Sequence, residues 1–287
     1  MGSAALLSGL SEVASDYDAV LCDVWGVIHN GREAFADACV ALKKFRDTRG
    51  PVVLITNAPV PKERVTRLFP KFGVPMDCFD DVIASGDATR NELKRVAPGP
   101  VYRIGLDEDF GVYAGLPLEF SDDPDVAKVV CCTSLREYPD GKPEPYRDEL
   151  KRLAAKRLPM ICANPDVVFR QGDKLIWSAG SLAKIYVEEG GQVISPGKPD
   201  EPIYRLAFER LAELAGKAVA PGRTLAIGDG PATDVLGANR QGVDALFIGG
   251  GIHGHSMGEG DAFLASAEKV LATDGVSAKW AMLELRW

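Results

Sequence analysis

The feature that most constrains the fold is a pair of short apolar runs that each end in polar residues. The first run, DAVLCDV, covers Asp18–Val24, and the second, PVVLIT, covers Pro51–Thr56. Between them, Ala34–Arg46 has the apolar spacing of a helix. Its apolar face consists of Phe35, Ala38, Leu42 and Phe45. A strand, a helix and a second strand in this order predict a βαβ unit with parallel strands. Both polar ends should then lie at the carboxyl edge of one sheet, where open α/β folds place their sites.

The same alternation returns near the other end of the chain. Pro202–Leu214 is predicted to be a helix, with Asp200 as its cap and Pro202 in its first turn. Its apolar face consists of Ile203, Leu206, Ala207, Leu211 and Leu214. A buried strand then runs into the sequence GDGPATD, and a helix and a further strand follow. These three elements are Thr224–Ile227, Val235–Arg240 and Ala245–Ile248. The segment GGGIHGHSMGEGD after them has the composition of a loop.

The middle of the chain forms a second α/β region, bordered on both sides by Pro and Gly. The expected strands are Val101–Ile104, Val129–Cys132 and Met160–Cys162, and the expected helix is Tyr146–Lys156. We therefore predict an α/β fold in which residues 1–84 and 180–287 form a Rossmann-like core with a parallel sheet. Residues 85–179 are expected to form an inserted α/β cap domain.

Composition narrows the possible partners and location. The formal net charge is -8 and the sequence pI is near 5.1, which argues against a nucleic-acid partner. No apolar run reaches the ~20 residues that a membrane span needs, and no Lys or Arg precedes the first apolar residues, as a signal peptide would require. The cysteines form no CxxC pair and are expected to be buried, reduced thiols. They are Cys22, Cys39, Cys78, Cys131, Cys132 and Cys162. We expect a cytoplasmic protein.

Four short segments carry residues suited to phosphate chemistry. They are DVWGV (Asp23–Val27), ITNAP (Ile55–Pro59), GKP (Gly197–Pro199) and GDGPATD (Gly228–Asp234). A carboxylate at a strand end can attack phosphorus and form an acyl phosphate. The charge on the transferred phosphoryl group must then be met by a hard cation and fixed donors. Mg²⁺ suits this role, because it takes oxygen ligands and usually only one or two protein carboxylates.

Each candidate side chain also has an ordinary structural interpretation. An aspartate after a strand is commonly a turn or cap residue, which applies to Asp23 and Asp229. Thr56 alone is typical of a capping hydroxyl, and Asn57 alone is typical of a turn. Lys198 alone is typical of a solvated surface. The order of all these residues along the chain, each next to an expected strand or helix, favours the phosphate site.

The four segments resemble, in order and spacing, the motifs of the haloacid dehalogenase superfamily. The sequence Asn164–Asp166, followed by Gly180–Ser181 ahead of Gly197–Pro199, resembles the class IIA branch of that superfamily. This branch includes the N-acetylglucosamine-operon, 4-nitrophenyl and pyridoxal phosphatase types. The resemblance covers nearly the whole chain and implies a Mg²⁺-dependent phosphatase that works through an aspartyl-phosphate.

The resemblance also implies a role for each residue. Asp23 is the nucleophile, and Thr56 and Lys198 hold the phosphoryl group. The implied metal ligands are Asp23, the backbone carbonyl of Trp25, Asp229 and, through water, Asp234. The implied substrate contacts are Asn57, Asn164 and Asp166.

Trp25 departs from the family pattern, because phosphatases of this family carry a second Asp there as general acid and base. An indole cannot move a proton at neutral pH, and losing a positioned acid/base typically costs ~10²–10⁴-fold in rate. His29 is the best placed substitute among the histidines, but the interpretation as an ordinary loop histidine is favoured. His253 and His255 have a two-ligand metal spacing without an evident third ligand. Ala58 and Pro59 also replace residues that relatives often have as Asn and Ser.

The sequence leaves the substrate open among sugar, nucleotide and aryl phosphates. A small-molecule substrate and a possible homodimer are expected, with neither nucleic acid nor membrane as a partner. One alternative function is a phosphate-ligand binding or regulatory protein whose catalysis decayed with Trp25. Another is a different reaction of an Asp nucleophile, such as phosphoryl transfer or C–halogen cleavage. The retained Asp229 disfavours C–halogen cleavage, because dehalogenases do not need Mg²⁺.

Overall fold

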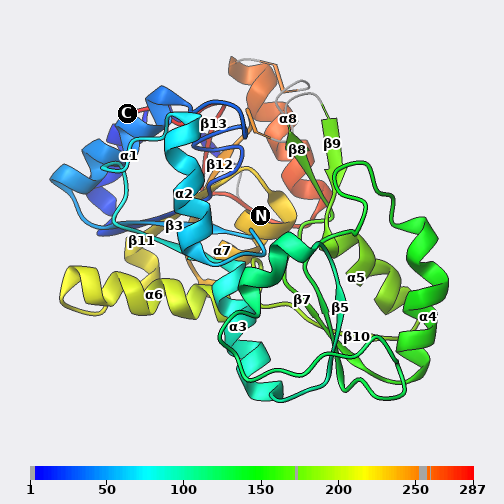
Figure 1. The fold of residues 1–287 in the computed structure, drawn as a ribbon. Coiled ribbons are helices and arrows are strands. Elements are labelled where there is room, and N and C mark those ends of the chain that lie inside the picture. The colour runs from blue at the N-terminus through cyan, green and yellow to red at the C-terminus, as the bar shows by residue number, and fades with distance from the viewer. Residues whose placement is uncertain (1–3, 172–173, 252–256, 259) are drawn as a thin grey trace. The chain divides into compact units, whose positions relative to one another are not determined.

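The computed structural model describes residues 4–171, 174–251, 257–258 and 260–287 (Figure 1). Contacts between residues divide the chain into two compact units. Unit 1 consists of Met1–Thr56, Thr66–Ile83 and Pro199–Trp287, and unit 2 consists of Asn57–Val65 and Ala84–Lys198. Each unit is discontinuous in sequence, so each is assembled from segments that lie far apart along the chain.

Unit 1 is built on a seven-stranded sheet in the order β1-β13-β12-β11-β2-β3-β4. Its strands are β1 (Ala5–Leu6), β2 (Ala19–Cys22), β3 (Val52–Thr56), β4 (Asp81–Ala84), β11 (Thr224–Gly228), β12 (Asp244–Ile248) and β13 (Trp280–Met282). The pairings from β1 through β3 are all parallel. Cys22 aligns with Ile227 on one side and with Leu54 on the other. The carboxyl ends of β11, β2 and β3 therefore lie side by side.

Helices cover the sheet of unit 1. They are α1 (Ala36–Thr48), α6 (Glu201–Ala215), α7 (Leu236–Gln241) and α8 (Gly260–Thr273). The helix α2 (Lys62–Phe72) is divided between the two units, and its residues from Thr66 onward belong to unit 1. α1 and α6 both pack on β3, and α7 packs on β12. Phe263 and Leu271 of α8 bury their side chains in one apolar cluster with Phe247 of β12 and Ala281 of β13. Unit 1 also contains short helical turns at Leu10–Glu12, Ala14–Asp16, Pro221–Arg223 and Pro231–Val235.

Unit 2 has its own four-stranded parallel sheet in the order β10-β7-β6-β5. Its elements are α3 (Ser85–Val96), β5 (Val101–Ile104), β6 (Val129–Cys132), α4 (Arg147–Ala155), β7 (Pro159–Cys162), the hairpin β8 (Val168–Gln171) and β9 (Lys174–Trp177), α5 (Ala179–Glu188) and β10 (Gln192–Ile194), with turns at Asp107–Val112 and Glu144–Tyr146. Successive side chains of a strand point to opposite faces. Accordingly, Val130 and Cys132 join the cluster of α4 and α5, whereas Val129 and Cys131 join Leu93 of α3.

The predicted α/β class with a parallel central sheet is confirmed. The strands and helices expected from the apolar pattern are present, with ends shifted by up to two residues. Asp200 is the residue before α6 as expected, but its carboxylate accepts a hydrogen bond from Arg240 at 2.5 Å and makes none to the helix. All six cysteines are buried and free. Among the described residues, no helix is both long and apolar enough to cross a bilayer.

The compact units differ from the predicted domain boundaries at residues 57–65, which group with unit 2, and at residues 180–198. The second segment was expected in the core with residues 199–287, but it groups with unit 2. The reason is that β10 pairs with β7, and that α5 packs on β6, β7 and β10. The segment thus completes the second sheet, and the chain returns to unit 1 only at Pro199.

Candidate active site

Three aspartates come together at the carboxyl edge of the unit 1 sheet. Asp23 directly follows β2, Asp229 directly follows β11, and Asp234 lies in the turn that leads into α7. Carboxylate oxygens of the three residues lie within 4.8 Å of one another. The exposed fractions are only 6% for Asp23, 8% for Asp229 and 6% for Asp234. Buried carboxylates this close repel one another unless a cation or a proton offsets their charge.

Backbone geometry fixes two of these carboxylates. The backbone N–H of Asp23 donates a 2.8 Å hydrogen bond to the carbonyl of Ile227, which ties the end of β2 to β11. Asp234 accepts a 3.0 Å hydrogen bond from the backbone N–H of Gly230 on its Oδ2, and its own N–H donates back to the Gly230 carbonyl at 2.8 Å. The turn after β11 therefore holds Asp234 beside Asp229.

Two glycines let the backbone approach Asp229 closely. Gly26 has a φ of +85°, and a Cβ added there would lie 2.2 Å from Oδ2 of Asp229. A Cβ added to Gly251 would lie 2.0 Å from the same oxygen. The peptide that joins Trp25 to Gly26 is thus brought next to the carboxylate cluster. The donor set is made of oxygen atoms alone, which fits a hard cation such as Mg²⁺.

Thr56 is the last residue of β3 and is 6% exposed. Because β3 is the parallel neighbour of β2, its carboxyl end lies at the same edge of the sheet as Asp23. The structure thus places Asp23, Thr56, Asp229 and Asp234 in one region of unit 1.

Trp25 is held by the loop that follows β2. Its backbone pairs with His29, and Gly26 N–H donates to the His29 carbonyl at 2.9 Å. The indole meets the His29 ring edge to face, with 5.2 Å between centroids. A Cβ on Gly31, where φ is +81°, would lie 2.4 Å from Cη2 of the indole. The ring is therefore packed against the backbone of its own loop.

His29 is a packing residue in this structure. It is 3% exposed, and its Nδ1 accepts a 3.0 Å hydrogen bond from the N–H of Gly31. Its ring lies 4.8 Å from that of Phe72 and 6.1 Å from that of Phe69. Burial in this apolar setting lowers the pKa of His29 to about 4. The side chain is consequently neutral at neutral pH, and it does not provide the acid that Trp25 lacks.

The remaining candidate residues lie in unit 2, where Asn57 joins two loops. Its Oδ1 accepts the backbone N–H of Lys198 at 2.8 Å. Its Nδ2 donates to the Lys198 carbonyl at 3.1 Å and to Oδ1 of Asp166 at 2.9 Å. A Cβ on Gly197 would lie 2.6 Å from Oδ1 of Asn57, so only glycine permits this contact. Asn57 therefore fixes the backbone of Lys198, which is itself 2% exposed.

Asn164 and Asp166 form a turn at the carboxyl end of β7. The Oδ1 of Asn164 accepts the backbone N–H of Asp166 at 3.1 Å, and the Asp166 carbonyl accepts the N–H of Gly180 at 3.1 Å. A substrate contact through the side chains of Asn57, Asn164 and Asp166 stays a prediction. In the structure these side chains hold one another and Lys198 in place.

The sequence reasoning missed Gly26, Gly31 and Gly251 as parts of the site. A signal was present for Gly251, because the sequence GGG directly follows the strand β12. No local pattern predicts that Asp229, distant in sequence, occupies the space of a Cβ on Gly26, or that the indole of Trp25 folds back onto Gly31. His253 and His255 lie outside the described residues.

Comparison with known proteins gives a consistent family. Residues 20–115 match the model for haloacid dehalogenase-like hydrolases, and residues 195–273 match a second model described as HAD-hydrolase-like. A hydrolase of the haloacid dehalogenase-like family from Brucella suis 1330 has 37% sequence identity and a TM-score of 0.86, with 97% of this chain and 99% of that chain covered. These findings confirm the resemblance predicted from the four motifs.

Two further relatives carry functional descriptions. The 5′-nucleotidase YutF of Bacillus subtilis (strain 168) is 24% identical over 248 residues, which is 82% of this chain and 88% of that protein. A possible sugar phosphatase of the HAD superfamily from Cytophaga hutchinsonii ATCC 33406 is 17% identical, with a TM-score of 0.78 and 97% of each chain covered. The second likeness supports the fold.

Proposed function

Because the chain belongs to the haloacid dehalogenase-like hydrolases, we propose that it is a Mg²⁺-dependent phosphatase that works through an aspartyl-phosphate on Asp23. The observation that carries this proposal is the group of three buried carboxylates of Asp23, Asp229 and Asp234 within 4.8 Å at the carboxyl edge of the sheet. Oxygen-only ligands and a strand-end nucleophile are the arrangement that phosphoryl transfer requires.

The covalent step belongs to Asp23. One oxygen of its carboxylate attacks phosphorus, the bond from phosphorus to the ester oxygen breaks, and the leaving group departs with that oxygen. A water then attacks the phosphorus of the aspartyl-phosphate, which releases inorganic phosphate and restores the carboxylate. Thr56 donates its hydroxyl to a phosphoryl oxygen, and Lys198 offsets negative charge on the transferred group.

The residues proposed to hold Mg²⁺ are Asp23, Asp229, the Trp25 carbonyl and, through water, Asp234. Bound there, the ion would neutralise charge on the phosphoryl group and offset the repulsion among the carboxylates. The close approach of Gly26 to Asp229 supports the Trp25 carbonyl as a ligand, because it puts that peptide beside the cluster.

Trp25 determines which esters are good substrates. With no acid at this position, and with His29 neutral and buried, the leaving oxygen departs without a proton from either side chain. Esters of phenols and acyl phosphates need little protonation, so they are the favoured class of small organic phosphates. Hydrolysis of the aspartyl-phosphate lacks its usual base with every substrate, so this step limits turnover.

The description of YutF as a 5′-nucleotidase keeps nucleotides among the candidate substrates, alongside sugar and aryl phosphates. A cytoplasmic location and a homodimer remain predictions from the sequence. A phosphate-binding protein without turnover is the second candidate function, and Trp25 is the observation that favours it.

Steady-state hydrolysis of 4-nitrophenyl phosphate, with Mg²⁺ and with a chelator, tests the proposal. We expect Mg²⁺-dependent turnover that Asp23→Asn abolishes, since an amide does not attack phosphorus. Asp229→Ala should abolish both turnover and the Mg²⁺ binding measured by calorimetry. Mg²⁺ and phosphate binding without any turnover would favour the second candidate function. Unchanged Mg²⁺ affinity in Asp229→Ala would place the metal site elsewhere.

A further inference from the structure

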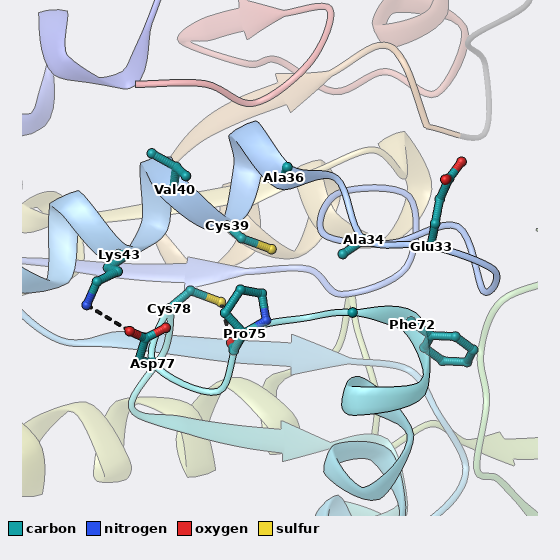
Figure 2. Close-up of a pocket in the computed structure, with 11 residues that line it drawn as sticks. Glu33, Ala34, Ala36, Cys39, Val40, Lys43, Phe72, Pro75, Asp77 and Cys78 are labelled. Carbon is teal, nitrogen blue, oxygen red and sulfur yellow. Dashed lines mark hydrogen bonds and ion pairs between the residues drawn. The ribbon is translucent and has the colours of Figure 1, made fainter.

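A hollow of about 390 Å³ lies on unit 1. None of the three aspartates lines it. Its wall is formed by α1 and by the segment between α2 and β4 (Figure 2). Cys39 of α1 and Cys78 of that segment both line it, together with Val40, Phe72 and Pro75. Figure 2 shows the two cysteines on facing elements, with both sulfur atoms close together beside the hollow.

The two thiols lie close enough to influence each other's pKa. The S–H of Cys78 donates a 3.1 Å hydrogen bond to the carbonyl oxygen of Pro75. The neighbouring Cys78 lowers the pKa of Cys39, whereas the neighbouring Cys39 and burial raise the pKa of Cys78. Cys39 is thus the sulfur of this pair that more readily becomes a thiolate, the form that reacts with oxidants.

We propose that Cys39 and Cys78 are a redox pair that a small hydroperoxide reaching the hollow converts into a reversible disulfide. The sulfur of Cys39 attacks one peroxide oxygen, the O–O bond breaks, and one water leaves with Cys39 as a sulfenic acid. The sulfur of Cys78 attacks this sulfur, the S–S bond forms and a second water leaves. In balance, two thiols lose two electrons and two protons, and one hydrogen peroxide becomes two waters.

The chain contains a matched pair that should not react. Cys132 and Cys162 align on the neighbouring strands β6 and β7 of unit 2, and both are buried within that sheet. Burial raises the pKa of both, to about 12 for Cys162. Neither residue lines the hollow. Both pairs place one cysteine near another. Cys39 and Cys78 differ from the second pair because both line the hollow and because the pKa of Cys39 is lowered.

The disulfide would connect α1 to the segment before β4. Such a cross-link reduces the conformational entropy of the unfolded chain and so stabilises the folded protein, provided that the native geometry accepts the bond. We therefore expect the oxidised protein to unfold at a higher temperature than the reduced protein.

The experiment treats the full-length protein with hydrogen peroxide in slight excess, alkylates the remaining thiols and maps peptides by mass spectrometry. We expect four alkylated cysteines and one linked peptide pair containing Cys39 and Cys78, reversed by dithiothreitol together with the rise in unfolding temperature. Cys39→Ser should retain five alkylatable thiols after the same treatment. Cys132→Ser, the matched control, should still form the link.

Three outcomes would overturn the proposal. They are six alkylated thiols after peroxide, a link between Cys132 and Cys162, and oxidation of Cys39 to a sulfinic or sulfonic acid without a link. If Cys39→Ser fails to fold, Cys78→Ser serves instead, with the prediction that Cys39 then accumulates as a sulfenic acid trapped by dimedone.

Discussion

At the scale of single residues, Trp25 distinguishes this chain from the phosphatases that its motifs resemble. Its ring packs on Gly31 and meets His29 edge to face, so the loop after β2 fixes the position of the indole. The sequence predicted the chemical deficit at this position but not the packing. Which group occupies the space beside an indole depends on the path of the loop, and no local pattern encodes that path.

Replacing Trp25 by Asp should restore the missing acid and base. We expect Trp25→Asp to raise the hydrolysis of alkyl phosphates by roughly 10²-fold, the lower end of the usual effect of a positioned acid/base. Aryl phosphates should gain less, because their leaving groups need little protonation. Trp25→Ala is the control, since it removes the ring without adding an acid and should bring no such gain. A fall in alkyl phosphate turnover in Trp25→Asp would show that the indole itself belongs to a specialised site.

His29 should make stability depend on pH. Its pKa is about 4 in the folded protein and about 6.5 in the unfolded chain, so the unfolded chain binds the proton more strongly. The stability that the neutral ring contributes is complete above pH 6.5 and is lost as the pH falls toward 4. The expected loss is roughly 3 kcal/mol at about 1.4 kcal/mol per pKa unit.

Urea unfolding of wild type and His29→Asn at a series of pH values between 4 and 7 measures this contribution. Burial raises the pKa of Asp87 to about 6, which gives a trend of opposite sign, but this contribution is common to both proteins. The difference between their unfolding free energies should therefore shrink as the pH falls below 6.5. Parallel pH curves would contradict a buried neutral His29.

At the scale of elements, the site is made by loops at the carboxyl ends of parallel strands. The apolar runs predicted β2, β3 and β11 and therefore which residues share an edge of the sheet. β1 and β13 have only two and three residues, too few for a periodic pattern to show. α8 begins at Gly260, within a segment whose glycine content indicated a loop. Composition alone does not show where this helix starts.

The loop after β2 should be sensitive at Gly26. Gly26→Ala should weaken Mg²⁺ binding at least tenfold, because the new methyl group would lie 2.2 Å from Oδ2 of Asp229. Gly216→Ala is the matched control, since its φ of +67° imposes a similar backbone strain and nothing lies within 4 Å of the added Cβ. Both variants should lose about 1 kcal/mol of stability from that strain. Equal Mg²⁺ affinities of the two variants by calorimetry would show that the Gly26 loop does not shape the metal site.

At the scale of the whole molecule, two parallel-sheet units alternate along one chain. The sequence predicted an inserted second α/β region because the phosphate motifs divide between the two ends of the chain. The residue at which the chain returns to unit 1 was harder to predict. The sequences of α5 and β10 resemble those of any helix and strand, and the pairing of β10 with β7 is what places them in unit 2. Pairing between distant strands is a long-range property, and the apolar pattern that identifies a strand does not identify its partner.

The central claim is that Asp23 carries the phosphoryl group and that its release limits turnover. The most direct measurement mixes the enzyme with 4-nitrophenyl phosphate and Mg²⁺, quenches with acid at short times, and maps phosphorylated peptides. We predict a burst of 4-nitrophenol equal to the enzyme concentration, slow turnover after it, and phosphate on the peptide that contains Asp23. A linear release of 4-nitrophenol with no phosphate on that peptide, and with Asp23→Asn as active as wild type, would contradict the account.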